Sequence, residues 1–167
     1  AVTVAVAVVV GVILGRELGS RDRNVAPAAT SAAAPMPATP APLTAGVSLV
    51  RRVGTREQPL TTGAQVAPGD RLSMFVRGSD SMFVYVLDED ATGEVYGLFP
   101  IPGLAPANPL QASTEHRLPG DLGNEVFYWT VTSAGERESI IAIGSRTPIR
   151  ELEEAIAHFP RATPGKP

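Results

Sequence analysis

Large apolar side chains fall on alternate positions through much of the chain after residue 46. In residues 71–76 they stand at Leu72, Met74 and Val76, which is the pattern of a strand with one buried face. A Pro-Gly-Asp turn precedes this strand. Similar patterns predict further strands at 47–53, 94–99, 126–131 and 139–144.

The run MFVYVL, residues 82–87, is apolar at every position. As a strand it would place Met82, Val84 and Val86 on one face. Phe83, Tyr85 and Leu87 would lie on the other face. Because both faces are apolar, this segment is predicted to be a central strand covered on both sides.

One amphipathic helix is predicted near the C-terminus. Its apolar stripe comprises Ile149, Leu152, Ile156 and Phe159. Thr147 is the expected N-cap, Pro148 the first helical residue and Pro160 the end. The stripe is expected to close an open edge or end of the sheet; the alternative is a partner-binding helix. Many short strands and one helix predict a mainly β fold, a small antiparallel β-sandwich with one C-terminal amphipathic helix.

The first fifteen residues, AVTVAVAVVVGVILG, carry no charge. As a helix they would span about 22 Å of a hydrocarbon core roughly 30 Å thick. Because the sequence begins with alanine, we expect the apolar segment to start further upstream. Residues 1–15 are therefore predicted to be a transmembrane helix truncated at its N-terminus. The alternatives are a buried strand or core helix and a secretory signal peptide.

Residues 16–45 are predicted to be a disordered linker, since residues 24–45 are almost wholly Ala, Pro, Thr and Ser. Five prolines forbid a continuous helix, and the side chains are too small for a core. The folded domain is then expected at residues 46–160, with a disordered tail at 161–167. A long spacer after a membrane anchor predicts a single-pass protein of the inner (cytoplasmic) membrane with its C-terminal domain extracytoplasmic.

Composition narrows the possible functions. The net charge of −3 leaves no basic surplus for a phosphate backbone, so nucleic acid is not an expected partner. Cysteine is absent, which excludes thiolate metal sites, thiol nucleophiles and disulfides. No cofactor is expected, because the chain has no glycine-rich phosphate loop.

A series of short motifs follows residue 66 in a characteristic order. The positions are Gly69 and Asp70, Tyr85, Asp90 and Gly93, Leu98 to Pro100, Asn108 and Pro109, Leu118 and Pro119, Gly135 and Glu136, then Ser145, Arg146 and Pro148. Over roughly residues 46–152 this arrangement resembles bacterial domain-of-unknown-function family 4384. The segment 101–107 looks like an insertion relative to the family pattern.

The resemblance implies a cellular location and no catalytic activity. Members of this family are often the extracytoplasmic C-terminal part of bacterial membrane proteins. They accompany protein kinases, caspase-like peptidases or zinc-binding anti-sigma modules. The resemblance brings no catalytic residues with it.

An acidic cluster follows the apolar strand at 82–87. Asp88, Asp90, Thr92 and Gly93 match positions one, three, five and six of a calcium loop. Position twelve is Phe99 instead of the bidentate glutamate, and the flanks are strands. A β-hairpin turn, with Gly93 at positive φ, is therefore favoured over a calcium site. Asp88, Asp90 and Thr92 remain the weak calcium candidate, and no other metal site is expected.

The two histidines, His116 and His158, lie in different parts of the sequence. The serines Ser79, Ser81 and Ser133 do not stand in the Gly-x-Ser-x-Gly motif that presents a nucleophilic serine. Glu136 and Glu138 flank Arg137 at a strand start and are expected on a solvated edge rather than to act as a paired acid and base. No catalytic residues are predicted, so the protein is not expected to be an enzyme.

The aromatic residues Phe127, Tyr128 and Trp129 are expected to be core on both sides of their strand. The alternative is that Tyr96 or Tyr128 belongs to a shallow binding surface for a sugar ring or peptide.

The function predicted from the sequence is a non-catalytic, membrane-tethered sensory or protein-interaction domain of a bacterial signalling or envelope protein. Its partners would be the membrane, through residues 1–15, and an unknown protein or cell-envelope ligand. The alternative is a glycan- or peptidoglycan-binding module, and the third reading is a hydrolase with an unrecognised site.

Overall fold

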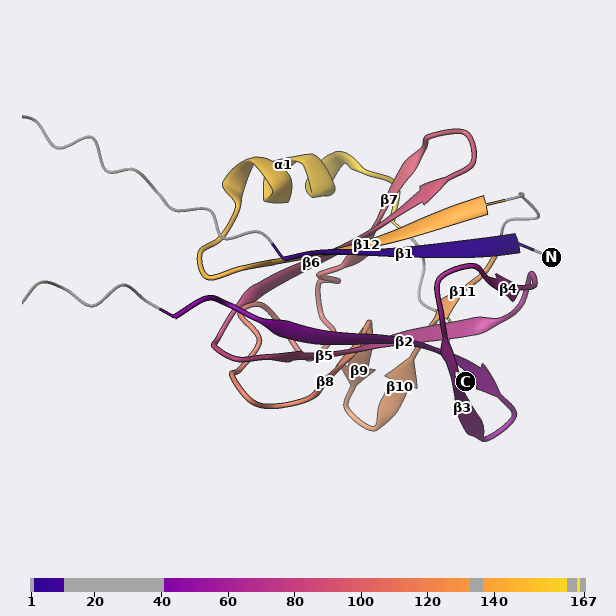
Figure 1. Cartoon of the computed structure of the whole chain (residues 1–167), viewed down its shortest axis with the longest axis horizontal. Helices are drawn as coiled ribbons and strands as arrows, with labels where there is room; N and C mark the ends of the chain where they lie inside the picture. The colour runs from indigo at the N-terminus through magenta and orange to yellow at the C-terminus, as the bar shows by residue number, and fades with distance from the viewer. Residues whose placement is uncertain (1, 11–40, 133–136, 162–164, 166–167) are drawn as a thin grey trace, which may run out of the picture.

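The computed structural model describes residues 2–10, 41–132, 137–161 and 165. In these residues the chain forms two β-sheets that lie face to face, with one helix on the outside of the first sheet (Figure 1). The prediction of a mainly β fold with one C-terminal helix is confirmed.

The first sheet has the strand order β4–β1–β12–β6–β7. These strands are β4 (Ala64–Val66), β1 (Val2–Val10), β12 (Arg137–Ser145), β6 (Phe83–Asp90) and β7 (Val95–Phe99). All neighbouring pairs are antiparallel except β1 and β12, which are parallel. The central position of β6 agrees with its apolar sequence.

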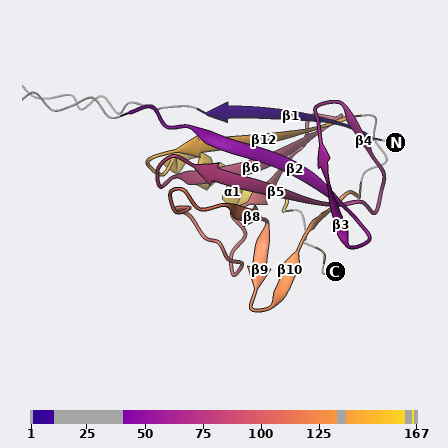
Figure 2. The ribbon, with the colours of Figure 1, turned by 60° about the horizontal axis from the view of Figure 1, so that its bottom comes forward.

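The second sheet has the order β11–β5–β2–β3, and β8 also pairs with β5. Its strands are β11 (Trp129–Thr130), β5 (Arg71–Gly78), β2 (Ala45–Val53), β3 (Arg56–Leu60) and β8 (His116–Leu118). A separate hairpin of β9 (Gly120–Leu122) and β10 (Glu125–Phe127) projects away from both sheets (Figure 2).

The two faces of β6 are covered by different elements. Met82, at the start of the segment, and Val84 and Val86 lie in the main core between the two sheets. Tyr85 and Leu87 lie in a second cluster on the outer face. The assignment of alternate residues to opposite faces is therefore confirmed.

The outer cluster is completed by α1 (Arg150–His158). Ile156 is buried in it, with Ile149, Leu152 and Phe159 packed around the cluster. The predicted apolar stripe is thus confirmed, but it covers the face of the first sheet rather than an edge.

The helix begins later than predicted. Its N-cap is Ile149, with extended backbone at φ −96° and ψ 90°, so Thr147 is not the cap. The Ile149 backbone N–H, which has no acceptor within the helix, donates to the Tyr85 hydroxyl at 3.1 Å. This bond joins the start of the helix to the sheet. The helix ends before Pro160, as expected.

Residues 2–10 form strand β1, so the prediction of a transmembrane helix over 1–15 is wrong for these residues. β1 pairs with β12 from Thr3 to Val10 and with β4 from Val2 to Val4. Valine has two branches at Cβ and favours a strand that has neighbours on both sides. Val4 is fully buried in the main core. Across the described ranges, no helix has the length and apolar character needed to cross a bilayer.

The folded unit also extends beyond its expected borders. Leu43 is buried in the main core, and β2 starts at Ala45. Near the other end, Arg161 forms a bridge with Gly97, and Gly165 exchanges two backbone hydrogen bonds with Tyr128. Residues 11–40, which hold the end of the predicted anchor and most of the predicted linker, lie outside the described residues, as do 162–164 and 166–167.

The expected strand at 126–131 is divided into β10 and β11 at Tyr128. The backbone of Tyr128 pairs with Gly165 instead of continuing either strand. The short strands β3, β4, β8 and β9 were not predicted, because three to five residues give too few alternations to recognise.

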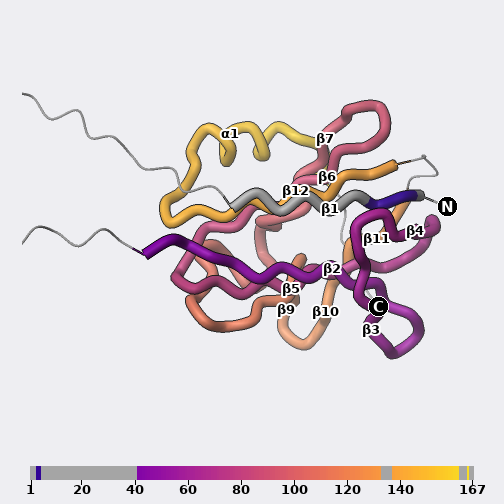
Figure 3. Tube along the Cα trace, viewed as in Figure 1, coloured from indigo at the N-terminus to yellow at the C-terminus, as the bar shows by residue number. Residues whose placement is uncertain are grey.

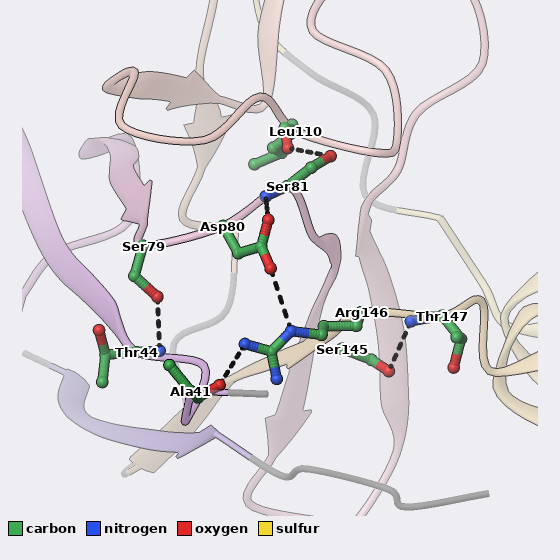
Figure 4. Close-up of polar contacts among 9 residues, drawn as sticks. All are labelled: Ala41, Thr44, Ser79, Asp80, Ser81, Leu110, Ser145, Arg146 and Thr147. Carbon is green, nitrogen blue, oxygen red and sulfur yellow. Dashed lines mark hydrogen bonds and ion pairs between the residues drawn. The ribbon is translucent and has the colours of Figure 1, made fainter. Parts of the chain in front are cut away.

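The chain crosses from β5 in one layer to β6 in the other through residues 79–82 (Figure 3). A polar network fixes this crossing (Figure 4). The Arg146 guanidinium donates to Asp80 at 3.1 Å and to the carbonyl of Ala41 at 2.6 Å. The backbone N–H of Thr44 donates to the Ser79 hydroxyl at 3.0 Å. Arg146 thus ties the end of β12 to the segment before β2 and to the crossing.

Candidate functional site

A cavity of about 320 Å³ opens between the two sheets, at the end where β6 turns into β7. Its apolar walls are core residues from both sheets: Leu72, Leu98, Trp129, Val131 and Ile140. Its polar lining comprises Asp88, Asp90, Tyr96, Thr130, Thr132, Glu138 and Arg161. The volume lies at the lower end of the roughly 300–1,000 Å³ typical of small-molecule sites.

The acidic residues of the cavity occupy positions that face the core. On β6, Asp88 and Asp90 continue the inward row that begins with Met82, Val84 and Val86. On β12, Glu138 continues the inward row of Ile140 and Ala142. Three carboxyl groups therefore stand where the alternation would otherwise place apolar side chains.

Burial changes the acidity of Asp88. It raises the pKa of this carboxyl to about 7, and the neighbouring carboxylates of Glu138 and Asp90 act in the same direction. The Oδ1 atom of Asp88 is buried and has no hydrogen-bond partner among the described residues. A buried oxygen of this kind is costly unless something donates to it.

Asp90 has a different role, although it lines the same cavity. Its Oδ1 accepts hydrogen bonds from the backbone N–H of Thr92 at 2.8 Å, the Thr92 hydroxyl at 2.7 Å and the N–H of Glu94 at 3.0 Å. The Thr92 hydroxyl is the main cause that lowers the pKa of Asp90. Gly93 has a φ of +84°, as the turn prediction required. Asp90 thus organises the β6–β7 turn.

The structure does not bring the calcium candidate together as an ion site. Thr92 directs its hydroxyl to Asp90. Within the described ranges, no group of three or more His, Asp or Glu side chains is placed to hold a metal ion. The chemistry of the cavity therefore has to be understood from its carboxylates and its aromatic rings.

Two aromatic residues, Tyr96 and Trp129, line the cavity together. Tyr96 is half-buried and donates its hydroxyl to Glu94 at 2.7 Å, which raises the pKa of the phenol to about 12. Trp129 is buried and donates its indole N–H to the carbonyl of Leu98 at 3.1 Å. This bond joins the two sheets beside the cavity and fixes the position of the indole.

Tyr128, the other aromatic candidate, is not part of a binding surface. Its side chain is only 1% exposed. It is held by two arginines: Arg52 donates to its hydroxyl, and the Arg117 guanidinium lies 4.6 Å from the centre of its ring. This burial agrees with the favoured expectation that Tyr128 is a core residue and does not support the alternative of a shallow platform, because these arginines and the bridge to Gly165 surround the side chain.

Glu138 is also not where the sequence placed it. It was expected on a solvated edge, but it is 7% exposed and lines the cavity. The pairing of β1 with β12 makes β12 an interior strand of its sheet, so its inward residues are covered. The missed signal was the period of two that links Glu138 to Ile140 and Ala142. Trp129 and Arg161 were likewise not recognised as lining residues.

The histidines and serines considered for catalysis contribute to local structure. One ring nitrogen of His116 lies 3.2 Å from the carbonyl of Gln111, and one of His158 lies 2.7 Å from that of Glu154. The Ser79 hydroxyl accepts from Thr44, and the Ser81 hydroxyl donates to the carbonyl of Leu110. Ser133 lies outside the described residues.

The family motifs recognised in the sequence also have structural roles. Asp70 accepts from the N–H of Ala67 at 2.9 Å and so closes the turn before β5. The side-chain amide of Asn108 accepts from the Val84 N–H at 3.0 Å and donates to the Val84 carbonyl at 2.7 Å. Arg146 makes the network of Figure 4. These motifs therefore specify turns and crossings of the fold.

No curated protein and no solved structure gives a significant match to this chain. Residues 65–148, about half of the chain, match one family of protein domains. This range includes the motif residues from Asp70 to Arg146, together with the carboxyl groups of the cavity. The chain belongs to the family described as Domain of unknown function (DUF4384).

Proposed function

We propose that this protein is a non-catalytic recognition domain that binds its ligand in the cavity between the two sheets. It would serve as the sensory or protein-interaction domain of a bacterial signalling or envelope protein. The observation that carries the proposal is the replacement of core side chains by Asp88, Asp90 and Glu138 around a cavity of ligand size.

The unfavourable placement of these carboxyl groups supports a role for them in ligand binding. Asp90 and Glu138 occupy directly opposed positions on neighbouring strands, where like charges destabilise a sheet. Asp88 adds a third carboxyl with a buried, unpartnered oxygen. Natural folds keep such unfavourable local choices mainly at functional sites.

The absence of an enzymatic role is part of the same proposal. The carboxylate of Asp90 is engaged in its turn, and Ser79, Ser81, His116 and His158 each make a local contact with the backbone. A recognition site needs no nucleophile and no proton relay, so the cavity as it stands is sufficient for binding.

The location of the domain outside the cytoplasmic membrane also remains a proposal. The chain belongs to DUF4384, and the family resemblance implies that members are often the extracytoplasmic C-terminal part of bacterial membrane proteins. Residues 2–10 give no support to it, because they form β1. Fractionation of bacterial cells that express the protein tests this part: recovery from the cytosol would contradict it.

A glycan-binding role is the second candidate. Tyr96 and Trp129 line the cavity beside carboxylates, and aromatic rings with nearby hydrogen-bond acceptors also suit a sugar. The buried position of Trp129 leaves no exposed platform for a polymer. A glycan ligand would therefore have to place a single ring or chain end in the cavity.

A variant that fills the cavity tests the proposed function directly. Thr132 is exposed at the rim, so Thr132→Trp would block the entrance with little effect on the core. We would screen the full chain against small amines, amino acids and sugars by ligand-detected NMR. Ligands that bind wild type and the matched control Thr114→Trp but not Thr132→Trp support the proposal. If no ligand is sensitive to Thr132→Trp, the proposal is wrong.

A further inference from the structure

The charge of the cavity lining indicates what kind of ligand it takes. Three carboxyl groups and one guanidinium, that of Arg161, line the cavity. Of the three acids, Asp90 is committed to its turn, whereas Asp88 has a buried oxygen that accepts nothing. An ionised carboxylate can only accept hydrogen bonds, so a ligand that satisfies Asp88 must be a donor.

The aromatic lining favours a donor that is also a cation. Trp129 and Tyr96 border the same space as Asp88 and Glu138. An indole ring attracts a cation more strongly than the other aromatic side chains do, and the attraction increases in a desolvated site. A neutral hydroxyl donor would gain the hydrogen bond to Asp88 but would leave the negative charge uncompensated.

The arrangement of the acidic groups favours an organic cation over a metal ion. Within the part of the chain that the structure describes, the acidic groups do not converge closely enough to hold a metal ion. An ammonium group on an organic body does not need several oxygen ligands at bonding distance. It can donate to one carboxylate while its carbon chain fills the apolar part of a cavity of about 320 Å³.

On the basis of the proposed function, we propose that the cavity binds a protonated primary amine, with its ammonium group against Asp88 and Glu138 and its carbon chain against Trp129. Two sources of this chemistry are a free polyamine and the side chain of a lysine in a partner. The ammonium group donates to the buried Oδ1 of Asp88, and the aromatic rings cover the alkyl chain.

The test is a titration of the full chain by calorimetry, with n-butylammonium, spermidine and Nα-acetyl-lysine amide as probes. We expect saturable binding that weakens at least about tenfold in Asp88→Asn and in Glu138→Gln. The matched control is Glu89→Gln, on the same strand as Asp88, with an exposed side chain on the opposite face; it should bind as wild type does. Tighter binding of spermidine identifies a free amine as the source, and tighter binding of the lysine amide identifies a peptide.

Four results would overturn the amine assignment. The first is equal affinity of wild type and both acid variants, and the second is binding of 1-butanol or N-acetylglucosamine as tight as that of n-butylammonium. The third is saturation by calcium chloride that depends on Asp88. The fourth is that no amine binds at about 10 mM. The Thr132→Trp screen separates these results from failure of the proposed function. Ligands lost in that variant would leave the cavity a binding site for another chemistry.

Discussion

Glu138 and Asp90 lie directly opposite each other on β12 and β6, and both face the space between the sheets. Asp88 is the next inward residue on β6, opposite Ile140. The end of the sandwich at the β6–β7 turn therefore concentrates negative charge, while the same strands bury Val84, Val86 and Ala142 further along. This change from apolar to acidic residues along one face defines the cavity.

The partly buried carboxyl group of Asp88 makes stability depend on pH in an unusual direction. The pKa of Asp88 is raised from 3.8 to about 7, so the folded chain binds its proton more tightly than the unfolded chain. The contribution of this group to stability is complete at low pH and is lost as pH rises between about 4 and 7. The groups around it are Asp90, Glu138, Tyr96 and Arg161.

We therefore expect Asp88→Asn to raise the free energy of unfolding, and to raise it clearly more at about pH 8 than at about pH 5. Urea denaturation of both proteins at the two pH values measures this difference. Glu89→Gln is the control, since this exposed residue should show no such dependence. An equal effect of Asp88→Asn at both values would mean that Asp88 stays ionised in the fold.

The same titration predicts how ligand binding responds to pH. If the ligand is a protonated amine, it binds the ionised form of Asp88, whose pKa is about 7 in the free protein. The affinity of wild type for n-butylammonium should then rise about tenfold between pH 6 and pH 8. In Asp88→Asn this rise should disappear. A calorimetric titration at both pH values measures it, and an affinity that falls with pH would contradict the assignment.

Periodicity predicted the fold better than it predicted the site, and one strand shows why. The alternation in 82–87 identified both faces of β6, because every position there is apolar. The same period of two extends to Asp88 and Asp90, but the charge of these two residues led to the prediction of a turn instead of inward positions on a strand. Asp90 indeed forms that turn while Asp88 does not, and a one-dimensional pattern does not separate the two.

Other features depended on contacts between distant segments. Glu138 is covered because β1 pairs with β12, and residues 2–10 lie far from residue 138 in the sequence. Hydropathy alone assigned these valines to a membrane, because a buried strand and a membrane segment are both uniformly apolar. Tyr128 was likewise covered by Arg52 and Arg117, which are remote from it in sequence.

The position of β1 can be tested with a charged substitution. Val4 is fully buried, so Val4→Asp should lower the free energy of unfolding by more than about 3 kcal/mol. The control is Val53→Asp, because Val53 is 53% exposed and should tolerate the charge. Both variants can be compared by urea denaturation of the full chain. Equal stability of the two variants would show that residues 2–10 do not contribute to the core.

Asn108 tests whether a family motif stabilises the fold. Its side chain makes both hydrogen bonds to the backbone of Val84, in the manner of an additional strand residue. Asn108→Ala leaves a backbone donor and acceptor without partners, so we expect a loss of about 2 kcal/mol or more in unfolding free energy. Asn124→Ala, at an exposed position, should change stability by less than about 0.5 kcal/mol. A similar small effect at Asn108 would mean that water replaces both bonds.

Among the glycines of the described residues, Gly120 leaves the least room for a side chain. Its φ is +122°, and a Cβ at this position would lie 2.1 Å from the carbonyl oxygen of Ala105. The loop residue Ala105 is joined to Asp121 of β9 by two backbone hydrogen bonds, at 2.7 and 2.8 Å, which restrain the Ala105 carbonyl oxygen. Gly120→Ala should therefore lower the unfolding free energy by more than about 3 kcal/mol, through both the clash and the backbone strain.

Gly123 is the matched control for this substitution. It also has positive φ, +63°, but a Cβ there would meet no atom within 4 Å. Gly123→Ala should cost only the strain of a left-handed backbone, about 1–2 kcal/mol. The difference between the two alanine variants, measured by urea denaturation, isolates the contact with Ala105 from the effect of positive φ. If both variants lose the same stability, the loop at 105 moves aside, and the close approach at Gly120 is not required by the fold.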